Sequence, residues 1–266
     1  MNVRDVLADL LAEQAALDPI VRGLSASDWD LPTASPRWSI TDQIAHLTYF
    51  DVTAATAIAS PEQWDEEIER LLGAAAGGDE ALDELTLGPL RALPARDRHT
   101  EWLAGRDALE AAAQGLDDNT RVAWYGPSMG SKSFLTARLM ECWAHGQDIV
   151  DAVGAERPPT DRLRHIAQLG YITRDWTYAN RKTEMPDGDI HVALKSPSGE
   201  TWTWGPAEAD STVRGPAEDF CLVVTQRRHP DDVDLEIIGE PARDWLSKAQ
   251  AFAGPPTDGP NPGAAS

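Results

Sequence analysis

The sequence predicts an α+β protein in which an N-terminal four-helix bundle precedes a smaller C-terminal α+β domain with an antiparallel sheet. Apolar residues recur at helical spacing over roughly the first 155 residues, and alternating strand-like runs become frequent in the last third of the chain. We expect the bundle to span 1–158, the second domain 159–253, and a disordered Pro/Gly-rich tail 254–266.

Five segments of the N-terminal part have helical periodicity. We expect four long helices at 2–24, 40–60, 97–115 and 131–153, and one shorter helix at 62–73. Ser39 is the candidate N-cap of the second long helix, and Asp42, three residues later, completes an acidic variant of the capping box. The segment before the fourth long helix contains two glycines and a proline and is predicted to be a loop.

The pattern changes after the prolines of ERPPTD. Residues 160–181 are predicted to form one more helix. The run DIHVALKSPSGETWTWG alternates around a Ser-Pro-Ser-Gly turn, which is typical of a β-hairpin. We expect a strand, a turn and a short helix in STVRGPAEDFCLVVTQRR, then a strand in DVDLEIIGE and a helix in PARDWLSKAQAF.

Charge and composition exclude several classes of function. Lys and Arg number 23 against 44 Asp and Glu, a net charge of −21 that repels phosphate backbones. No apolar run approaches the ~20 residues that a membrane span needs, and the N-terminus is acidic where a signal peptide is basic. The two cysteines, Cys142 and Cys221, are too few for a disulfide framework. We expect a cytoplasmic protein that binds neither nucleic acid nor membrane.

The segment MECWAHGQD, residues 140–148, contains candidate metal ligands. Glu141 and His145 are four residues apart, so on a helix they project from one face, and both side chains bind divalent metals. In so acidic a chain the same spacing also fits a solvated ion pair. Asp148 is either a carboxylate that orients His145 or a surface acid. Cys142 points about 100° away around the helix and is predicted to pack in the core.

His46 is the candidate third ligand. It lies between the apolar residues Ile44 and Leu47 in the second long helix, where a lone histidine also fits a partly buried core position. If this helix packs against the fourth, His46 meets the face that carries Glu141 and His145. Three protein ligands leave at least one coordination position open, which is the catalytic arrangement for zinc.

Two segments together resemble a known family. The run WSITDQIAHL, residues 38–47, resembles the helix-opening motif of mycothiol-dependent maleylpyruvate isomerase-like proteins, which belong to the wider DinB-like superfamily of metal-binding four-helix bundles. The run ECWAHGQD, residues 141–148, is similar to their second motif. The resemblance extends to about residue 253 and points to an uncharacterised metal-binding branch of the family rather than to the isomerase itself.

The resemblance implies a divalent metal ion, usually zinc, held by His46, Glu141 and His145. It also implies that the open coordination position binds the thiolate of mycothiol, or of a similar low-molecular-weight thiol, as cosubstrate. A divalent cation lowers the pKa of a thiol, so that thiolate forms at neutral pH and attacks an electrophile. Addition to a conjugated double bond, rotation and elimination would isomerise a small substrate, whereas displacement of a leaving group would be a transfer.

Cations that could bind a substrate carboxylate lie in the C-terminal half. The family's isomerase uses an arginine of its C-terminal domain near the metal, and Arg227 is the first candidate here, ahead of Arg214 and Arg228. Each of the three also fits a surface charge at the end of an element. Two other functions stay open: a non-catalytic protein that binds metal or a small ligand, and a metal-dependent hydrolase with water in place of thiol.

Overall fold

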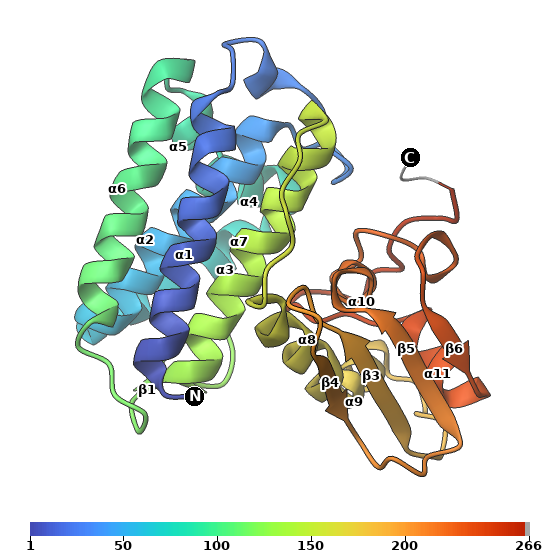
Figure 1. Ribbon diagram of the computed structural model, residues 1–266. Helices are drawn as coiled ribbons and strands as arrows, with labels where there is room; N and C mark the ends of the chain where they lie inside the picture. The colour runs from blue at the N-terminus through green and yellow to red at the C-terminus, as the bar shows by residue number, and fades with distance from the viewer. Residues whose placement is uncertain (264–266) are drawn as a thin grey trace. The chain divides into compact units, whose positions relative to one another are not determined.

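The chain forms two compact units, Met1–Arg157 and the residues from Pro158 onward. The computed structural model describes residues 1–263 (Figure 1). The first unit is helical apart from one small strand pair and the second combines helices with a sheet, which confirms the predicted α+β class. The division lies next to the boundary expected after residue 158, and the assignment of the two units as domains stays a prediction.

Four long helices build the N-terminal bundle close to the predicted positions. They are α1 (Val3–Arg22), α2 (Ile40–Ala59), α6 (Ala95–Ala113) and α7 (Ser131–Val153). Both α1 and α2 pack against α6 and α7, so α2 and α7 are neighbours in the bundle (Figure 1). Apolar side chains of all four helices are fully buried between them, among them Leu10, Ile44, Trp102 and Leu139.

The start of α2 is fixed by the predicted capping box. The Ser39 backbone N–H donates to Asp42 Oδ2 at 2.8 Å, and the Ser39 hydroxyl lies 3.0 Å from the same oxygen. Arg91 Nε donates to the other carboxylate oxygen at 2.6 Å. These contacts hold the first turn of α2, and His46 follows within two turns of it.

Shorter elements complete the N-terminal unit. The helix expected at 62–73 is α3 (Pro61–Ala76), and the short helices η1 (Asp28–Asp30), α4 (Asp79–Thr86) and α5 (Gly88–Arg91) also form. The segment predicted as a loop before α7 contains a two-stranded antiparallel sheet, β1 (Arg121–Val122) and β2 (Met129–Gly130). Strands of two residues are too short to show an alternating pattern, so periodicity does not reveal them.

The C-terminal unit is built on a four-stranded sheet of order β4-β3-β5-β6. The predicted hairpin forms from β3 (Ile190–Lys195) and β4 (Thr201–Trp204), and β6 (Glu236–Ile238) is antiparallel to β5 (Ser211–Pro216). However, β5 pairs in parallel with β3, so the sheet is mixed and not wholly antiparallel. The reason is that β4 reverses the chain, which then returns on the other side of β3 in its original direction.

Four helices accompany this sheet: α8 (Leu163–Ile172), α9 (Arg174–Arg181), α10 (Ala217–Val224) and α11 (Glu240–Leu246), with the short η2 (Pro230–Asp232). The single helix expected over 160–181 is wrong, because it is interrupted at Thr173. The Thr173 hydroxyl donates to Leu169 O at 2.8 Å, one of the local bonds through which threonine competes with regular helix.

The residues after the last helix follow an irregular path. Arg181 Nη1 donates to Asp258 Oδ1 at 2.7 Å, and the Thr257 hydroxyl donates to Gln226 Oε1 at 2.6 Å. Residues 264–266 of the expected tail lie outside the described residues. Disorder of the 254–266 segment stays a prediction.

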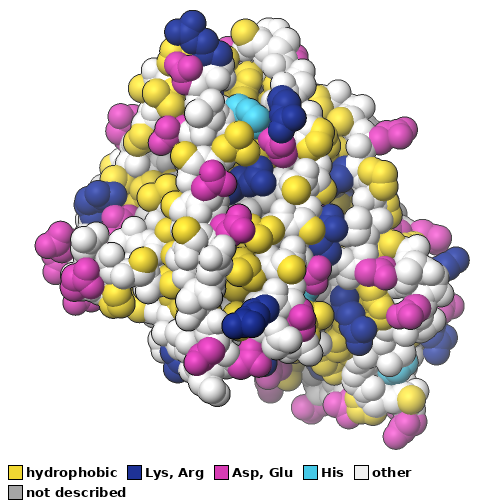
Figure 2. All heavy atoms as spheres, turned by 60° about the vertical axis from the view of Figure 1, so that its left-hand side comes forward, with side chains coloured by type: hydrophobic (Ala, Val, Ile, Leu, Met, Phe, Trp, Pro, Cys, Tyr) yellow, Lys and Arg dark blue, Asp and Glu magenta, His cyan; other side chains and the backbone are white. Residues whose placement is uncertain are grey.

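The surface in Figure 2 mixes acidic, basic and hydrophobic side chains. On this face the basic side chains lie among acidic and hydrophobic ones. Among residues 1–263, no helix combines the length and the apolar character needed to cross a bilayer.

Candidate metal centre

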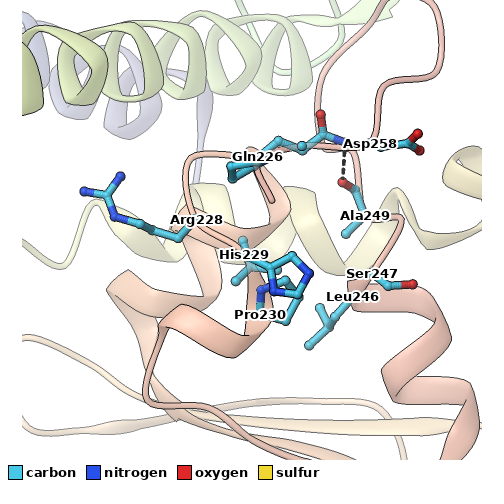
Figure 3. A pocket seen from close by; sticks show the side chains of 11 residues that line it. Gln226, Arg228, His229, Pro230, Leu246, Ser247, Ala249 and Asp258 are labelled. Atoms are coloured by element: carbon cyan, nitrogen blue, oxygen red, sulfur yellow. Dashed lines mark hydrogen bonds between the residues drawn. The ribbon is translucent and has the colours of Figure 1, made fainter. Parts of the chain in front are cut away.

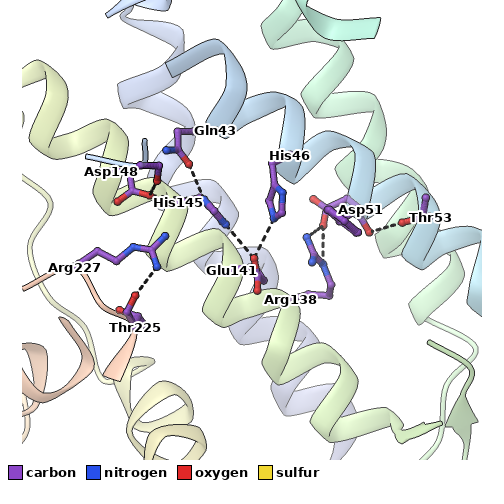
Figure 4. A network of polar contacts seen from close by, with 12 residues as sticks. Gln43, His46, Asp51, Thr53, Arg138, Glu141, His145, Asp148, Thr225 and Arg227 are labelled. Carbon is purple, nitrogen blue, oxygen red and sulfur yellow. Dashed lines mark hydrogen bonds and ion pairs between the residues drawn. The ribbon is translucent and has the colours of Figure 1, made fainter. Parts of the chain in front are cut away.

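Two neighbouring helices bring the three predicted ligands together. His46 Nε2 of α2 lies 3.2 Å from Glu141 Oε2 of α7, and His145 Nε2 lies 3.1 Å from the same oxygen. One donor atom from each residue lies within 4.8 Å of the other two. Figure 4 shows the three side chains pointing toward one another between the helices. The i,i+4 spacing on α7 and the α2–α7 packing therefore produce the convergence that the sequence predicts.

Aromatic side chains surround the three polar groups. The Trp38 ring lies 5.2 Å from the His46 ring and 5.9 Å from the His145 ring, measured between centroids. The Phe50 ring, one turn after His46 on α2, lies 4.6 Å from the His46 ring. The side chains of His46, Glu141 and His145 are 18%, 20% and 13% exposed. The donor atoms are thus largely shielded from water while the site keeps access to solvent.

Gln43 fixes the orientation of His145. Its Oε1 lies 2.6 Å from His145 Nδ1, and its Nε2 donates to Thr33 Oγ1 at 2.8 Å. A carboxamide oxygen only accepts, so His145 Nδ1 carries a proton toward Gln43, and Nε2 is the nitrogen that faces Glu141. Gln43 was not predicted as a site residue. Its signal is the i,i+3 spacing to His46, which places both side chains on one face of α2.

Asp148 is buried close to the same imidazole but makes a longer contact. Its Oδ2 lies 3.7 Å from His145 Nδ1 and accepts a hydrogen bond from the Ser35 hydroxyl at 3.2 Å. The surface-acid alternative is therefore wrong, because Asp148 is only 3% exposed. Its supporting role toward a metal ligand stays a prediction, and Gln43 is the closer hydrogen-bond partner of His145.

The electrostatics of the site favour the metal-binding protonation states. Burial lowers the pKa of His46 to about 4, and the neighbouring His145 adds to the shift, so the imidazole is neutral at pH 7. Burial by itself raises the pKa of Glu141, but hydrogen bonds with His145 and His46 outweigh it and hold that pKa well below its usual value. A neutral imidazole and an ionised carboxylate are the forms that coordinate a metal.

The donor set fits zinc or a similar divalent ion. Two imidazole nitrogens and one carboxylate oxygen form the catalytic three-ligand set, in which a further position stays open. Cys142, by contrast, lies in the apolar core of the bundle, and burial raises the pKa of its thiol. It packs as predicted. Coordination by His46, Glu141 and His145 stays a prediction that this geometry supports.

The candidate arginines belong to the C-terminal unit. Arg227 Nη1 donates to Thr225 O at 2.6 Å, and Arg214 pairs with Glu236 across the sheet at 3.5 Å. Arg228 lines a small cavity of about 10 Å³, with room for about one water molecule (Figure 3). Gln226, at the edge of this cavity, donates to Ala249 O at 3.0 Å. A catalytic role for Arg227 stays a prediction.

Comparisons with known proteins give matches over both units. The model of the mycothiol maleylpyruvate isomerase N-terminal domain matches residues 10–150, and a model described as wyosine base formation matches residues 186–236. The uncharacterized protein Rv0036c of Mycobacterium tuberculosis strain H37Rv is 43% identical over 253 residues, covering 95% of this chain and 97% of its own. The uncharacterized protein MT0041 of strain CDC 1551 gives the same values.

Two crystal structures of the mycothiol-dependent maleylpyruvate isomerase, one of them a mutant, share the fold. Each has a TM-score of 0.57 and 16% sequence identity, over 85% of this chain and 90% of the isomerase. The structural likeness extends through both halves of the chain, and the family model alone covers more than half of the 266 residues. The protein therefore belongs to the family of the mycothiol maleylpyruvate isomerase N-terminal domain, which confirms the predicted resemblance.

Proposed function

We propose that this protein holds one divalent metal ion, zinc in the first instance, through His46, Glu141 and His145. We further propose that it uses mycothiol or a similar low-molecular-weight thiol to isomerise a small electrophile, or to transfer the thiol onto it. The observation that carries the proposal is the convergence of three donor atoms from α2 and α7 within 4.8 Å. Family membership supports the choice of a thiol as cosubstrate.

The residues of the site have separable tasks in this proposal. A bound divalent ion would lower the pKa of the thiol and so supply a nucleophile at neutral pH. Gln43 holds His145 in the tautomer that presents Nε2, through the 2.6 Å contact with Nδ1. Trp38 and Phe50 exclude water beside the imidazoles, which strengthens electrostatic interactions there. The planar aromatic rings also favour a planar, conjugated substrate.

The deciding experiment is a thiol-dependence assay on the metal-loaded protein. Maleylpyruvate, on which the structurally similar isomerase acts, is the first substrate to test, followed by activated alkyl halides as transfer substrates. We expect turnover that requires both metal and thiol. Turnover without thiol would instead favour a metal-dependent hydrolase, and bound metal without any turnover would favour a non-catalytic binding protein.

A pair of variants on α7 controls this assay. Glu141→Gln keeps the shape of the side chain and removes the charge of the proposed ligand, so activity and metal content should fall together. Asp151→Asn makes the same carboxylate-to-amide change at an exposed position of the same helix, where Gln147 Nε2 donates to it at 2.8 Å. Its activity should equal that of the wild type.

A further inference from the structure

A buried ion pair joins the two helices that carry the proposed ligands. Arg138 of α7 contacts Asp51 of α2, with Nη2 and Nε at 3.2 Å and 3.3 Å from Asp51 Oδ1. The two side chains are only 5% and 4% exposed. Arg138 precedes Glu141 by one helical turn, and Asp51 follows His46 by about one and a half turns (Figure 4).

Further side chains hold this ion pair in place. Gln14 of α1 donates to Asp51 Oδ2 at 3.1 Å, so each carboxylate oxygen of Asp51 accepts from a different helix. Arg106 of α6 is a second cation close enough to act on Asp51 electrostatically. The buried Nε and Nη1 atoms of Arg106 have no hydrogen-bond partner among the residues described. All four long helices thus contribute to one charged layer inside the bundle.

Phe50 lies between this charged layer and His46. The Arg138 guanidinium lies 5.9 Å from the centre of the Phe50 ring, and the Phe50 ring lies 4.6 Å from the His46 ring. On α7, Arg138 and Glu141 are three residues apart and share one face of the helix. A shift of Arg138 would therefore act on both ligand-bearing helices.

Stability alone does not account for such a pair. Removing two charges from water is costly, and well-packed apolar residues in their place are often equally or more stabilising. What a buried, hydrogen-bonded pair does supply is a fixed geometry, which apolar side chains specify less well. Metal coordination needs such a geometry, because the donor atoms must be held to within roughly 0.5 Å of their productive positions.

We propose that Asp51 and Arg138 are positioning residues, which set the spacing and rotation of α2 against α7 so that His46 meets Glu141 and His145. This inference rests on the proposed metal site. It assigns the pair a role in metal affinity and coordination geometry, in addition to any role in folding.

The test uses the full-length protein with both partners of the pair replaced, Asp51→Leu with Arg138→Met. This double variant removes both charges of the pair together, so neither partner is left without the other, and the metal-free protein should melt within about 5 °C of the wild type. Its dissociation constant for zinc, measured by competition with a chromophoric chelator, should rise about 10–100-fold. The visible absorption of bound cobalt(II) should change as well, because the ligand geometry changes.

A second buried pair provides the matched control. Arg157 Nη1 lies 3.5 Å from Glu13 Oε1, with side chains 6% and 4% exposed, and this pair does not involve α2. The control, Glu13→Leu with Arg157→Met, should bind zinc as tightly as the wild type. Equal weakening in both double variants would contradict the inference, because it would show a general effect of bundle rigidity.

One conservative variant tests the same inference if the double variant does not fold. Arg138→Lys keeps the charge but replaces two guanidinium contacts with a single flexible ammonium, so zinc affinity should fall about 3–10-fold in a folded protein. Wild-type affinity in Arg138→Lys and in the double variant would overturn the inference while leaving the proposed metal site intact. Failure of the wild type itself to bind zinc would overturn both.

Discussion

The two units of the chain bury different kinds of polar group. Within the described residues, the N-terminal unit buries charged side chains, namely Glu13, Asp42, Asp51, Arg138 and Asp148. The buried polar side chains of the C-terminal unit are hydroxyls, one amide and one imidazole: Thr177, Ser196, Ser211, Thr212, Thr225, Gln250 and His165. Burying charge is costly unless it is paired. These groups lie in the unit that holds the candidate metal centre.

The largest expected effect is a loss in the free energy of unfolding caused by a substitution in the core of the C-terminal unit. Trp245 is fully buried and packs edge-on against Phe220 and Tyr171, at 5.9 Å and 6.4 Å between ring centroids. Trp245→Ala should lower the free energy of unfolding by about 3–5 kcal/mol, measured by urea denaturation, because it leaves a large cavity. Trp176→Ala, at a 44% exposed position, should change it by less than about 0.5 kcal/mol.

The metal content of Trp245→Ala tests whether its effect is confined to the C-terminal unit. Folded Trp245→Ala protein should bind zinc with the same stoichiometry as the wild type. Loss of zinc at a temperature where the variant is still folded would contradict the division of tasks between the units.

The next effect concerns the acid stability of the metal-free N-terminal unit. The pKa of His46 is lowered from 6.5 to about 4, so the unfolded chain takes up a proton there before the folded chain does. Above pH 6.5 His46 is neutral in both states and does not change the free energy of unfolding. As the pH falls from 6.5 toward 4, proton uptake by the unfolded chain lowers the free energy of unfolding by about 2–3 kcal/mol. Denaturation of chelator-treated protein across this pH range measures it. His46→Gln should abolish this part of the pH dependence, and an unchanged profile in that variant would exclude His46 as its source.

The helices of the bundle were predictable because periodicity and capping are local properties. The apolar spacing and the Ser39–Asp42 capping box located α2, and the Glu141–His145 spacing located one face of α7. The parallel pairing of β5 with β3 was not predictable, since a strand pattern carries no information on chain direction. In the sequence Thr173 fits an ordinary helical position. Only the structure shows that the helix is interrupted there, between α8 and α9, where the Thr173 hydroxyl donates to Leu169 O.

The candidate site also has residues that were predicted from the sequence and residues that were not. Glu141 and His145 were predicted as a candidate pair from their i,i+4 spacing, and the resemblance to the family's two motifs completed the set with His46. Gln43 and the Asp51–Arg138 pair were missed because their partners lie on another helix, and only the packing of α2 against α7 brings them together. The i,i+3 spacing of Gln43 to His46 is a signal in the sequence, whereas no motif or spacing joins Asp51 to Arg138, 87 positions further on.

A smaller effect distinguishes the two partners of His145. Gln43→Leu removes the acceptor at 2.6 Å from Nδ1, so zinc affinity should fall about 10–100-fold. Asp148→Asn changes a group at 3.7 Å and should have a smaller effect. Chelator competition measures both, and a larger loss in Asp148→Asn would assign the orienting role to Asp148.

The smallest effect belongs to the charged surface of the C-terminal unit. Arg214 and Glu236 form an ion pair with side chains 53% and 60% exposed. Arg214→Gln should lower the free energy of unfolding by less than about 1 kcal/mol and leave metal content unchanged, because exposed pairs contribute little. A clear loss of zinc-dependent activity in this variant would instead bring Arg214 forward as a substrate-binding residue, ahead of Arg227.

Elemental analysis of the full-length protein, purified without chelators, tests the proposed metal site. We expect about one divalent ion per chain in the wild type and close to none in His46→Ala and Glu141→Ala. A wild-type protein that holds no metal after supplementation with zinc or nickel would contradict it.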